Sequence, residues 1–313
     1  MFHLTPIPLM SPTLSECIRK FFCLSLLTIL ALSPLKSSDS LAVDSTNQAK
    51  VRQFVIFSAA AYGVALYGLN EAWYDDFPRS EFHFFNDNHE WKQLDKAGHF
   101  YSAFHLSNTG IHLLKKAGVP QKKAHFWGGM VGIMILTPIE ILDGFSDEYG
   151  ASWGDIIANV TGSTVAMGQH MLWNEVRIKP KFSFKSTSYA SYRPNVLGDG
   201  FHEQILKDYN GQTYWLSVDL YAFMKSKKFP KWLNIAFGYG AQNMVYANDL
   251  QNEVQGFDSY RQYYLALDPD LSHIQSKSKF LNTCLYLVDL IHLPAPALEY
   301  NRVQGWKFHA LSF

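Results

Sequence analysis

The sequence predicts an α+β protein: a bundle of about four apolar helices at the N-terminal side, followed by an antiparallel β-rich part with one further helix. Two observations carry this prediction. Between residues 51 and 176, apolar runs rich in small residues are interrupted by glycine and proline, as in tightly packed helices. After Pro180, short segments alternate between apolar and polar residues with the period of β-strands.

Length and charge set the outer bounds. A chain of 313 residues is long enough to bury a full core and to form two domains. It carries 27 basic and 27 acidic residues, so no basic surface for nucleic acid is expected. The mean hydropathy of −0.09 averages strongly apolar segments with polar ones. The 15% aromatic content suits packed helices or the aromatic belts of membrane interfaces.

Residues 1–42 are interpreted as a signal peptide. Arg19 and Lys20 form a short positive region, and 21–32 is an apolar run of the length expected for a signal core. Pro34 ends the run, and Ser40-Leu41-Ala42 offers a cleavage site between small residues. A membrane anchor is the alternative, but the run is short against the about 20 residues of a span.

Cysteine usage points to neither a lipid anchor nor an internal disulfide. Cys23 lies inside the apolar run and not at its end, so no lipoprotein attachment cysteine is recognised. Cys17 and Cys23 would be removed with the signal peptide, which leaves Cys284 alone.

Residues 50–178 are expected to form the helical domain. Helices are predicted over 51–67, from Lys96 to Lys116, from Gln121 to Pro138, and from Ser152 or Trp153 to about Val176. The polar and aromatic segment 70–91 is expected to be an irregular connection or an interfacial segment.

These helices are predicted to be associated with a membrane. The apolar stretches 124–139 and 156–167 are shorter than the about 20 residues of a clean span. Their glycines and other small residues permit close helix contacts of the kind found in membrane bundles. The core of a soluble bundle is the alternative.

Residues 179–313 are expected to form a β-rich extension. Strands are predicted over 181–186, 214–221, 232–239, 261–267 and 307–313. A helix is predicted over 280–292, ended by Pro294 and Pro296. A terminal Phe313 on an alternating strand is typical of outer-membrane barrels. Five or six strands nevertheless favour a small antiparallel sheet packed on the bundle.

Polar residues recur at helical spacing at the edges of the apolar runs. Asp95 and His99 are four residues apart, Asp155 and Asn159 are four apart, and Glu140 and Asp143 are three apart, so each pair shares a helix face. Burying such charges is costly without partners. The three segments therefore predict one shared, inward-facing cluster.

The cluster contains residue types suited to a divalent cation or to acid–base chemistry. The candidate metal ligands are Asp95, His99, Glu140, Asp143, Asp147 and Asp155, and the candidate catalytic residues are His99, Glu140 and Asp155. The cluster lacks the metal-binding His-x-x-x-His and Glu-x-x-His spacings. In the structural alternative, Asp95 and Ser152 cap helices, Lys96 pairs with a buried acid, and His99 is a satisfied core histidine.

The pattern over 95–162 resembles the domain-of-unknown-function family 2279, a predicted periplasmic lipoprotein group of bacteria, and more distantly VanZ-like membrane proteins. The matching blocks are Asp95-Lys96-Ala97-Gly98-His99-Phe100, Glu140 with Asp143-Gly144, Gly150-Ala151-Ser152-Trp153-Gly154-Asp155, and Asn159 with Gly162. The motif residues outside the chemical candidates are Lys96, Gly98, Gly144, Gly150, Ser152, Asn159 and Gly162. The resemblance implies an envelope location but no particular reaction or cofactor. The chain departs from the family in lacking a lipobox and in its long C-terminal extension.

Two functional hypotheses follow. The first is a non-enzymatic cell-envelope protein, exported and either periplasmic or associated with the inner or outer membrane, with membrane lipid or envelope proteins as partners. The second is a membrane-associated, metal-dependent hydrolase or transferase acting on an envelope lipid or glycan precursor. An enzyme needs an open pocket with converging ionisable groups, whereas a scaffold needs those groups mutually satisfied.

Overall fold

The computed structural model describes residues 78–225, 230–274 and 276–312, together with Arg52, Ile56, Tyr62 and Gly63. The chain divides into two compact units, one comprising residues up to Phe85 with 141–151, the other residues 86–140 with 152–313. The predicted signal peptide and most of the helix predicted over 51–67 lie outside the described residues.

In the smaller unit, residues 80–85 run beside residues 144–151. Ser80 N–H donates to Phe145 O at 3.0 Å, and His83 N–H donates to Gly144 O at 2.9 Å. The Phe82 ring packs edge-on against Phe145 and lies over Gly144, where a Cβ would come within 2.3 Å of the ring. Gly144 is therefore required for this close approach.

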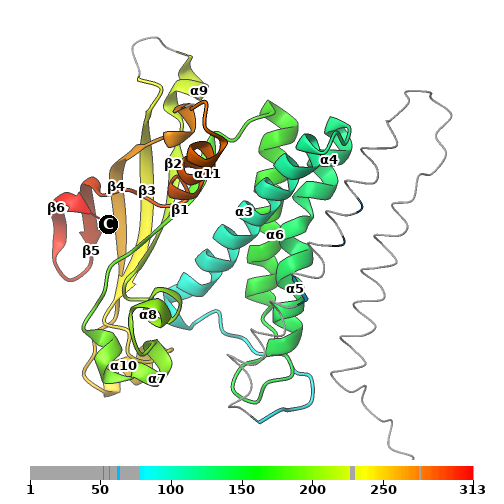
Figure 1. Cartoon of the computed structure of the whole chain (residues 1–313). Helices are drawn as coiled ribbons and strands as arrows, with labels where there is room; N and C mark the ends of the chain where they lie inside the picture. The colour runs from blue at the N-terminus through cyan, green and yellow to red at the C-terminus, as the bar shows by residue number, and fades with distance from the viewer. Residues whose placement is uncertain are drawn as a thin grey trace, which may run out of the picture. The chain divides into compact units, whose positions relative to one another are not determined.

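The helices near the N-terminal side of the described chain match the predicted bundle. They are η1 Trp91–Gln93, α3 Leu94–Lys116, α4 Gln121–Gly129, α5 Val131–Asp143 and α6 Trp153–Trp173 (Figure 1). Within the larger unit, α6 packs along α3, and α4 contacts both. Gly162 lies at the α3–α6 contact, where a Cβ would be 2.3 Å from the Phe100 carbonyl oxygen.

Two predicted helix boundaries differ from the structure. The segment expected to end at Pro138 forms two helices that break at Met130, beside Gly129, and α5 continues past Pro138 to Asp143. Glycine is a poor helix former, whereas proline removes a single backbone donor. The helix predicted to reach Val176 ends at Trp173 because Asn174 adopts a left-handed conformation with φ of 59°.

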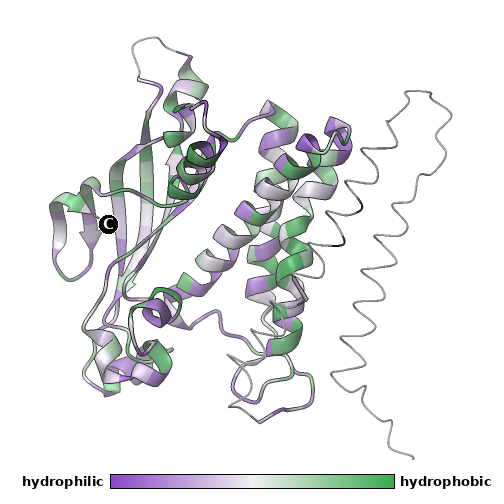
Figure 2. Cartoon of the chain, in the orientation of Figure 1, coloured by the Kyte–Doolittle hydropathy of each residue, from purple (hydrophilic) through white to green (hydrophobic). Residues whose placement is uncertain are grey.

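One stretch of the described chain has the length and composition of a membrane span. Gln121–Asp143, comprising α4 and α5, is 23 residues long, and 44% of its most apolar 18-residue window is buried. The helix α5 is mostly hydrophobic (Figure 2). Core helices of soluble proteins share these properties, so the stretch supports a span only weakly.

The C-terminal part forms a six-stranded antiparallel sheet in the order β1-β2-β3-β4-β5-β6, each strand pairing with the next (Figure 1). The strands are β1 Ile178–Phe184, β2 Gln212–Val218, β3 Leu233–Gln242, β4 Tyr260–Pro269, β5 Ala295–Asn301 and β6 Gly305–Ser312. The predicted further helix is α11 Lys279–Val288. The α+β class is thus confirmed.

The sequence does not predict β5 or several short helices. Pro294 and Pro296 predict the end of a helix, but Pro296 lies within β5 at a register shift with β6, where a strand tolerates proline. The connections also hold short helices: η2 Tyr189–Tyr192, α7 Pro194–Leu197, α8 Phe201–Lys207, α9 Leu220–Met224, α10 Asp249–Val254 and η3 Leu271–His273. Segments of three to seven residues are too short to show a helical period.

One face of the sheet is buried around Trp215. Its ring lies 5.4 Å from the Tyr264 ring and packs with the small residues Ala236, Ala266 and Ala297. Small side chains on β3, β4 and β5 leave room for the two large rings on β2 and β4. On its other face, the sheet contacts α3 at β1 and β2.

Candidate functional site

Polar side chains from α3, α5 and α6 meet in one cluster within the larger unit. Asp95, Lys96 and His99 come from α3, and Glu140 comes from α5. Asp155 and Asn159 come from the first turns of α6. We call these residues, together with Asp87 and Ser152, the ion cluster. The helical spacing that predicted a shared cluster therefore corresponds to a shared location.

Lys96 is the central counter-ion of the ion cluster. Its Nζ lies 3.0 Å from Asp155 Oδ1 and 3.1 Å from Asp95 Oδ2, and it also donates to Asp87. The lysine side chain is 14% exposed. Because buried carboxylates are costly without a positive partner, Lys96 stabilises three acids at once.

Ser152 joins the start of α6 to the other members. Its hydroxyl accepts the backbone N–H of Asp155 at 3.2 Å, which is the predicted cap, and donates to Asp87 Oδ1 at 2.6 Å. The Ser152 backbone N–H donates to Glu140 Oε2 at 3.4 Å. Ser152 thus caps the first turn of α6 and holds the carboxylates of Asp87 and Glu140 in place.

His99 lies between an amide and three carboxylates. Its Nδ1 donates to Asn159 Oδ1 at 3.1 Å and lies 3.5 Å from Glu140 Oε1. Its Nε2 is 3.7 Å from Asp95 Oδ1 and 4.0 Å from Asp155 Oδ1. Both ring nitrogens therefore face oxygen atoms that accept protons, which favours the charged imidazolium.

Burial and charge shift these ionisations in opposite directions. Burial alone would lower the pKa of His99, but the charges of Asp95, Asp155 and Glu140 outweigh it and raise that pKa. Burial, helped by the charge of Asp95, raises the pKa of Asp155 to about 7. Burial would also raise the pKa of Asp95, but His99 and Lys96 hold it below its usual value. Asp155 is thus the carboxyl that titrates near neutrality.

Two members of this environment were not predicted. Asp87 lies in the irregular segment before η1, and no helical spacing relates it to Lys96. Tyr209 lies just before β2, and its hydroxyl donates to Asp95 Oδ1 at 3.2 Å. Burial raises the pKa of Tyr209 well above its usual value, so the phenol remains a donor. Both contacts join segments distant in sequence, so the chain pattern offers no signal for them.

Other predicted residues lie elsewhere or have packing roles. Asp143 and Asp147 belong to the smaller unit, where Asp147 N–H donates to Pro78 O at 3.1 Å. Gly150 also belongs to that unit and lies against Phe85. In the larger unit, Gly98 of α3 faces the Tyr214 hydroxyl. Four of the six metal candidates, Asp95, His99, Glu140 and Asp155, come together in the ion cluster.

The ion cluster has a donor set that divalent cations use. One ligand atom each from Asp95, His99 and Asp155 lie within 4.8 Å of one another. The ammonium of Lys96 already lies within about 3 Å of two of these three residues. A metal ion would compete with a permanent positive charge for the same oxygens, so the residues fit a metal only if Lys96 moves away.

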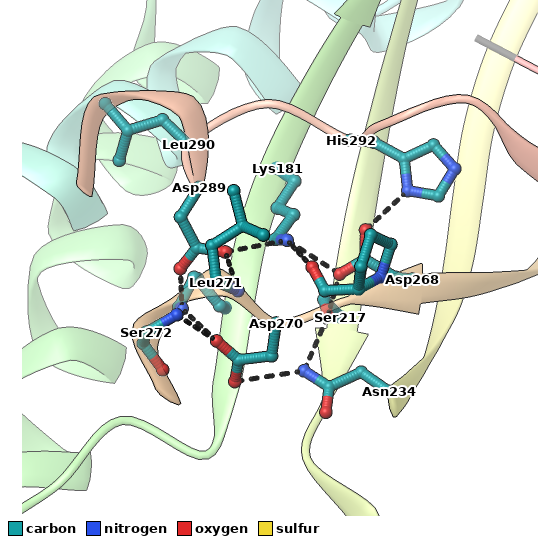
Figure 3. Close-up of polar contacts among 12 residues, drawn as sticks. Lys181, Ser217, Asn234, Asp268, Asp270, Leu271, Ser272, Asp289, Leu290 and His292 are labelled. Atoms are coloured by element: carbon teal, nitrogen blue, oxygen red, sulfur yellow. Dashed lines mark hydrogen bonds and ion pairs between the residues drawn. The ribbon is translucent and has the colours of Figure 1, made fainter. Parts of the chain in front are cut away.

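A second buried network, not predicted from the sequence, lies on the buried face of the sheet (Figure 3). Lys181 Nζ lies 2.7 Å from Asp268 Oδ2 and 3.0 Å from Asp289 Oδ1. His292 donates from Nδ1 to Asp268 Oδ1 at 2.8 Å, and Ser217 donates to Asp268 Oδ2 at 2.6 Å. Ser217 thus bonds to the aspartate and not to the histidine, unlike a hydrolase triad. With its members buried, the network serves the fold.

Comparisons with known proteins agree with the envelope prediction. Residues 82–170 match the family described as predicted periplasmic lipoprotein (DUF2279). No curated protein and no solved structure matches the chain. The matched segment holds the helical members of the ion cluster, which confirms the resemblance of the sequence to this lipoprotein family. The part of the chain that carries the ion cluster therefore matches a family of predicted periplasmic lipoproteins, in agreement with an exported protein of the bacterial cell envelope.

Proposed function

We propose that this envelope protein is a non-enzymatic module associated with a membrane, with a β-rich extension that contacts membrane lipid or other envelope proteins. In this proposal the ion cluster holds α3, α5 and α6 together and performs no reaction. The position of Lys96 is the observation that carries it.

The reasoning starts from the needs of a catalytic site. A general base or metal ligand must offer a lone pair to substrate or ion. Here Lys96 engages Asp87, Asp95 and Asp155, while Asn159 accepts from His99. Groups already paired with one another have to break those pairs before they can act. This pairing supports a structural role, although the buried Asn159 Nδ2 has no hydrogen-bond acceptor among the described residues.

Thermal unfolding of Lys96→Met tests this proposal. Removal of one partner from a buried ion network typically costs about 3–5 kcal/mol. The variant should therefore unfold at a clearly lower temperature than the wild type. Lys207→Met is the matched control, because Lys207 pairs with Glu203 at 3.1 Å on the surface of α8. Loss of a surface pair should change the unfolding temperature little.

The metal content of the purified protein provides a second test of this proposal. We expect no divalent ion in stoichiometric amount in the wild type, and no shift of its unfolding temperature on addition of a chelator. A bound ion that is present in the wild type and absent from Asp155→Asn would contradict the proposal.

The 4.8 Å grouping of Asp95, His99 and Asp155 supports a second candidate function. In this alternative, the protein is a membrane-associated, metal-dependent hydrolase or transferase that acts on an envelope lipid or glycan precursor. His99 and Asp155 would hold the ion or transfer protons, and Lys96 would swing aside on binding. Measurement of the metal content of the purified protein, described above, also separates this candidate from the first.

A further inference from the structure

The sheet buries charged residues beside the Trp215 core on one face and exposes large apolar side chains on the other. Along β5, the buried positions include Glu299 and Asn301, whereas Leu298 and Tyr300 are exposed. Strand β4 repeats the pattern, with Asp268 buried and Leu265 exposed. In water, a one-sided antiparallel sheet buries its apolar face and exposes its polar face. Here the charged residues are inside.

The register of the strands assembles the exposed side chains into transverse rows. One row is aromatic and runs across β3 to β6. It begins at Tyr239, which is half-buried and donates its hydroxyl to the Lys92 carbonyl oxygen, and continues through the exposed Tyr263, Tyr300 and Trp306. The next row, two residues along each strand, has only large apolar side chains: Phe237, Leu265, Leu298 and Phe308. We call the two rows together the apolar face. Phe237 is 56% exposed, Leu265 45% and Phe308 69%.

Polarity changes in one direction along the strands. Beyond the aromatic row, on the same face, β4 carries Arg261, whose pairing partner on β3 is Ala241. On the other side of the apolar row, Ile235 pairs with Leu267. The order is therefore charged, aromatic, apolar, apolar, over steps of about 7 Å each. Membrane-facing sheets show this order from the headgroups, where Tyr and Trp gather, to the hydrocarbon.

We propose that the apolar face of β3–β6 is a lipid-contacting surface, with the aromatic row at the headgroup level and the next row among the acyl chains. This inference deepens the proposed function, since it names the lipid partner of the β-rich extension. A contiguous exposed apolar surface marks a membrane or protein contact. Protein interfaces usually carry about one hydrogen bond per 100–200 Å². Between the Tyr hydroxyls and the end of the sheet, the apolar face offers no side-chain donor or acceptor among the described residues.

The sheet topology limits how the contact is made. Strand β6 ends the order of the sheet, and open sheet edges are not tolerated inside hydrocarbon. Four of the six strands, β1, β2, β5 and β6, have only seven or eight residues, fewer than the about 9–11 residues of a spanning strand. Lipid contact by one face at the membrane surface satisfies both limits, because the edges can remain near water.

Depth-resolved quenching tests the proposal on the full chain bound to vesicles. Single cysteines replace Leu265, Leu298 or Tyr263, with the native cysteines changed to serine, and each carries an environment-sensitive fluorophore. The vesicles contain phosphatidylethanolamine and phosphatidylglycerol, with or without bromine atoms deep in the acyl chains. Leu250→Cys is the matched control, because Leu250 is apolar, 72% exposed and located on α10, away from the apolar face.

Labels at residues 265 and 298 should be quenched strongly by brominated chains, the label at 263 less, and the label at 250 least. Equal quenching at 265 and 250 would overturn the proposal, as would failure of the labelled chain to float with vesicles. A label at 265 that is shielded from both water and bromine would instead indicate a second protein copy over the face. None of these labels touches the ion cluster, so this result is independent of the Lys96 experiment.

Discussion

At the residue scale, one lysine decides the behaviour of the ion cluster. Four carboxylates, Asp87, Asp95, Glu140 and Asp155, lie around Lys96 and His99. With all groups ionised, the acids exceed the bases by two charges (four minus two). Burial, helped by the charge of Asp95, raises the pKa of Asp155, and retention of a proton there reduces this excess, while His99 and Lys96 hold the pKa of Asp95 below its usual value.

A pH dependence follows from the raised pKa of Asp155. In the unfolded chain this carboxyl has its ordinary pKa of 3.8, whereas in the folded chain its pKa is about 7. Between these values the folded state binds more protons, so stability falls as pH rises. Asp155→Asn cannot lose a proton, so the wild type should lose stability relative to this variant from about pH 4 to pH 7, and not above.

Chemical unfolding of both proteins at several pH values measures this difference. Its size should be on the order of a few kcal/mol, because one pKa unit corresponds to about 1.4 kcal/mol. Parallel pH profiles for wild type and Asp155→Asn would show that Asp155 is already ionised in the folded state at low pH. Asp147→Asn, in the smaller unit and outside the ion cluster, serves as the control for the loss of one carboxylate.

Helical spacing is what made part of the cluster predictable. Asp95 and His99, or Asp155 and Asn159, share a helix face whatever the tertiary structure, so their grouping follows from sequence. Asp87 and Tyr209 enter through irregular segments, whose positions depend on the complete fold. Glu140 and Asp143 also share a spacing, yet they fall in different units, because the boundary between the units lies inside the last turn of α5, after Glu140.

At the element scale, the contact between α3 and α6 positions the cluster. Asp95, Lys96 and His99 face Asp155 and Asn159 because the two helix backbones approach closely. Small residues allow this approach, and Gly162 of α6 lies directly against the Phe100 carbonyl of α3. The spacing of the helices thus sets the distances between the charges.

Two glycine substitutions on the same helix test this contact. Gly162→Ala should lower the unfolding temperature, because its Cβ would lie 2.3 Å from the Phe100 oxygen and the helices would have to separate. Overpacking of this kind typically costs about 1–3 kcal/mol. Gly168→Ala meets nothing within 4 Å and should stabilise the helix by about 0.5–1 kcal/mol. Equal effects of the two substitutions in thermal unfolding would contradict the close packing of α3 and α6.

Elements with a long, regular pattern were predicted more accurately than short ones. The helix α3 and the strands β3 and β4 show clear periods over ten or more residues. Strand β5 has only seven residues, and its second residue is Pro296. The proline obscures the alternation of apolar and polar residues in this strand. The sequence does not predict which face of the sheet is buried, because alternation alone does not distinguish the buried face from the exposed one.

At the scale of the whole molecule, the helices and the sheet of the larger unit distribute charged and apolar side chains in the same way. Helices and sheet both place ionisable residues inside, around Lys96 and around Lys181, and both expose apolar side chains. A protein surrounded by water gains little from this arrangement. A protein beside lipid gains from it, and an envelope location supplies the lipid.

Such a protein has to be exported, and the last prediction concerns that step. The positive residues Arg19 and Lys20, the apolar run to Leu32 and the small residues Ser40 and Ala42 predict cleavage after Ala42. Mature protein isolated from an envelope fraction should therefore begin at or near Val43, as N-terminal sequencing or intact mass would show. Replacement of the small residue in Ala42→Arg should block processing and leave a longer precursor. A chain that keeps Met1 or Met10 in the wild type would show that the apolar run is an anchor and not a cleaved signal.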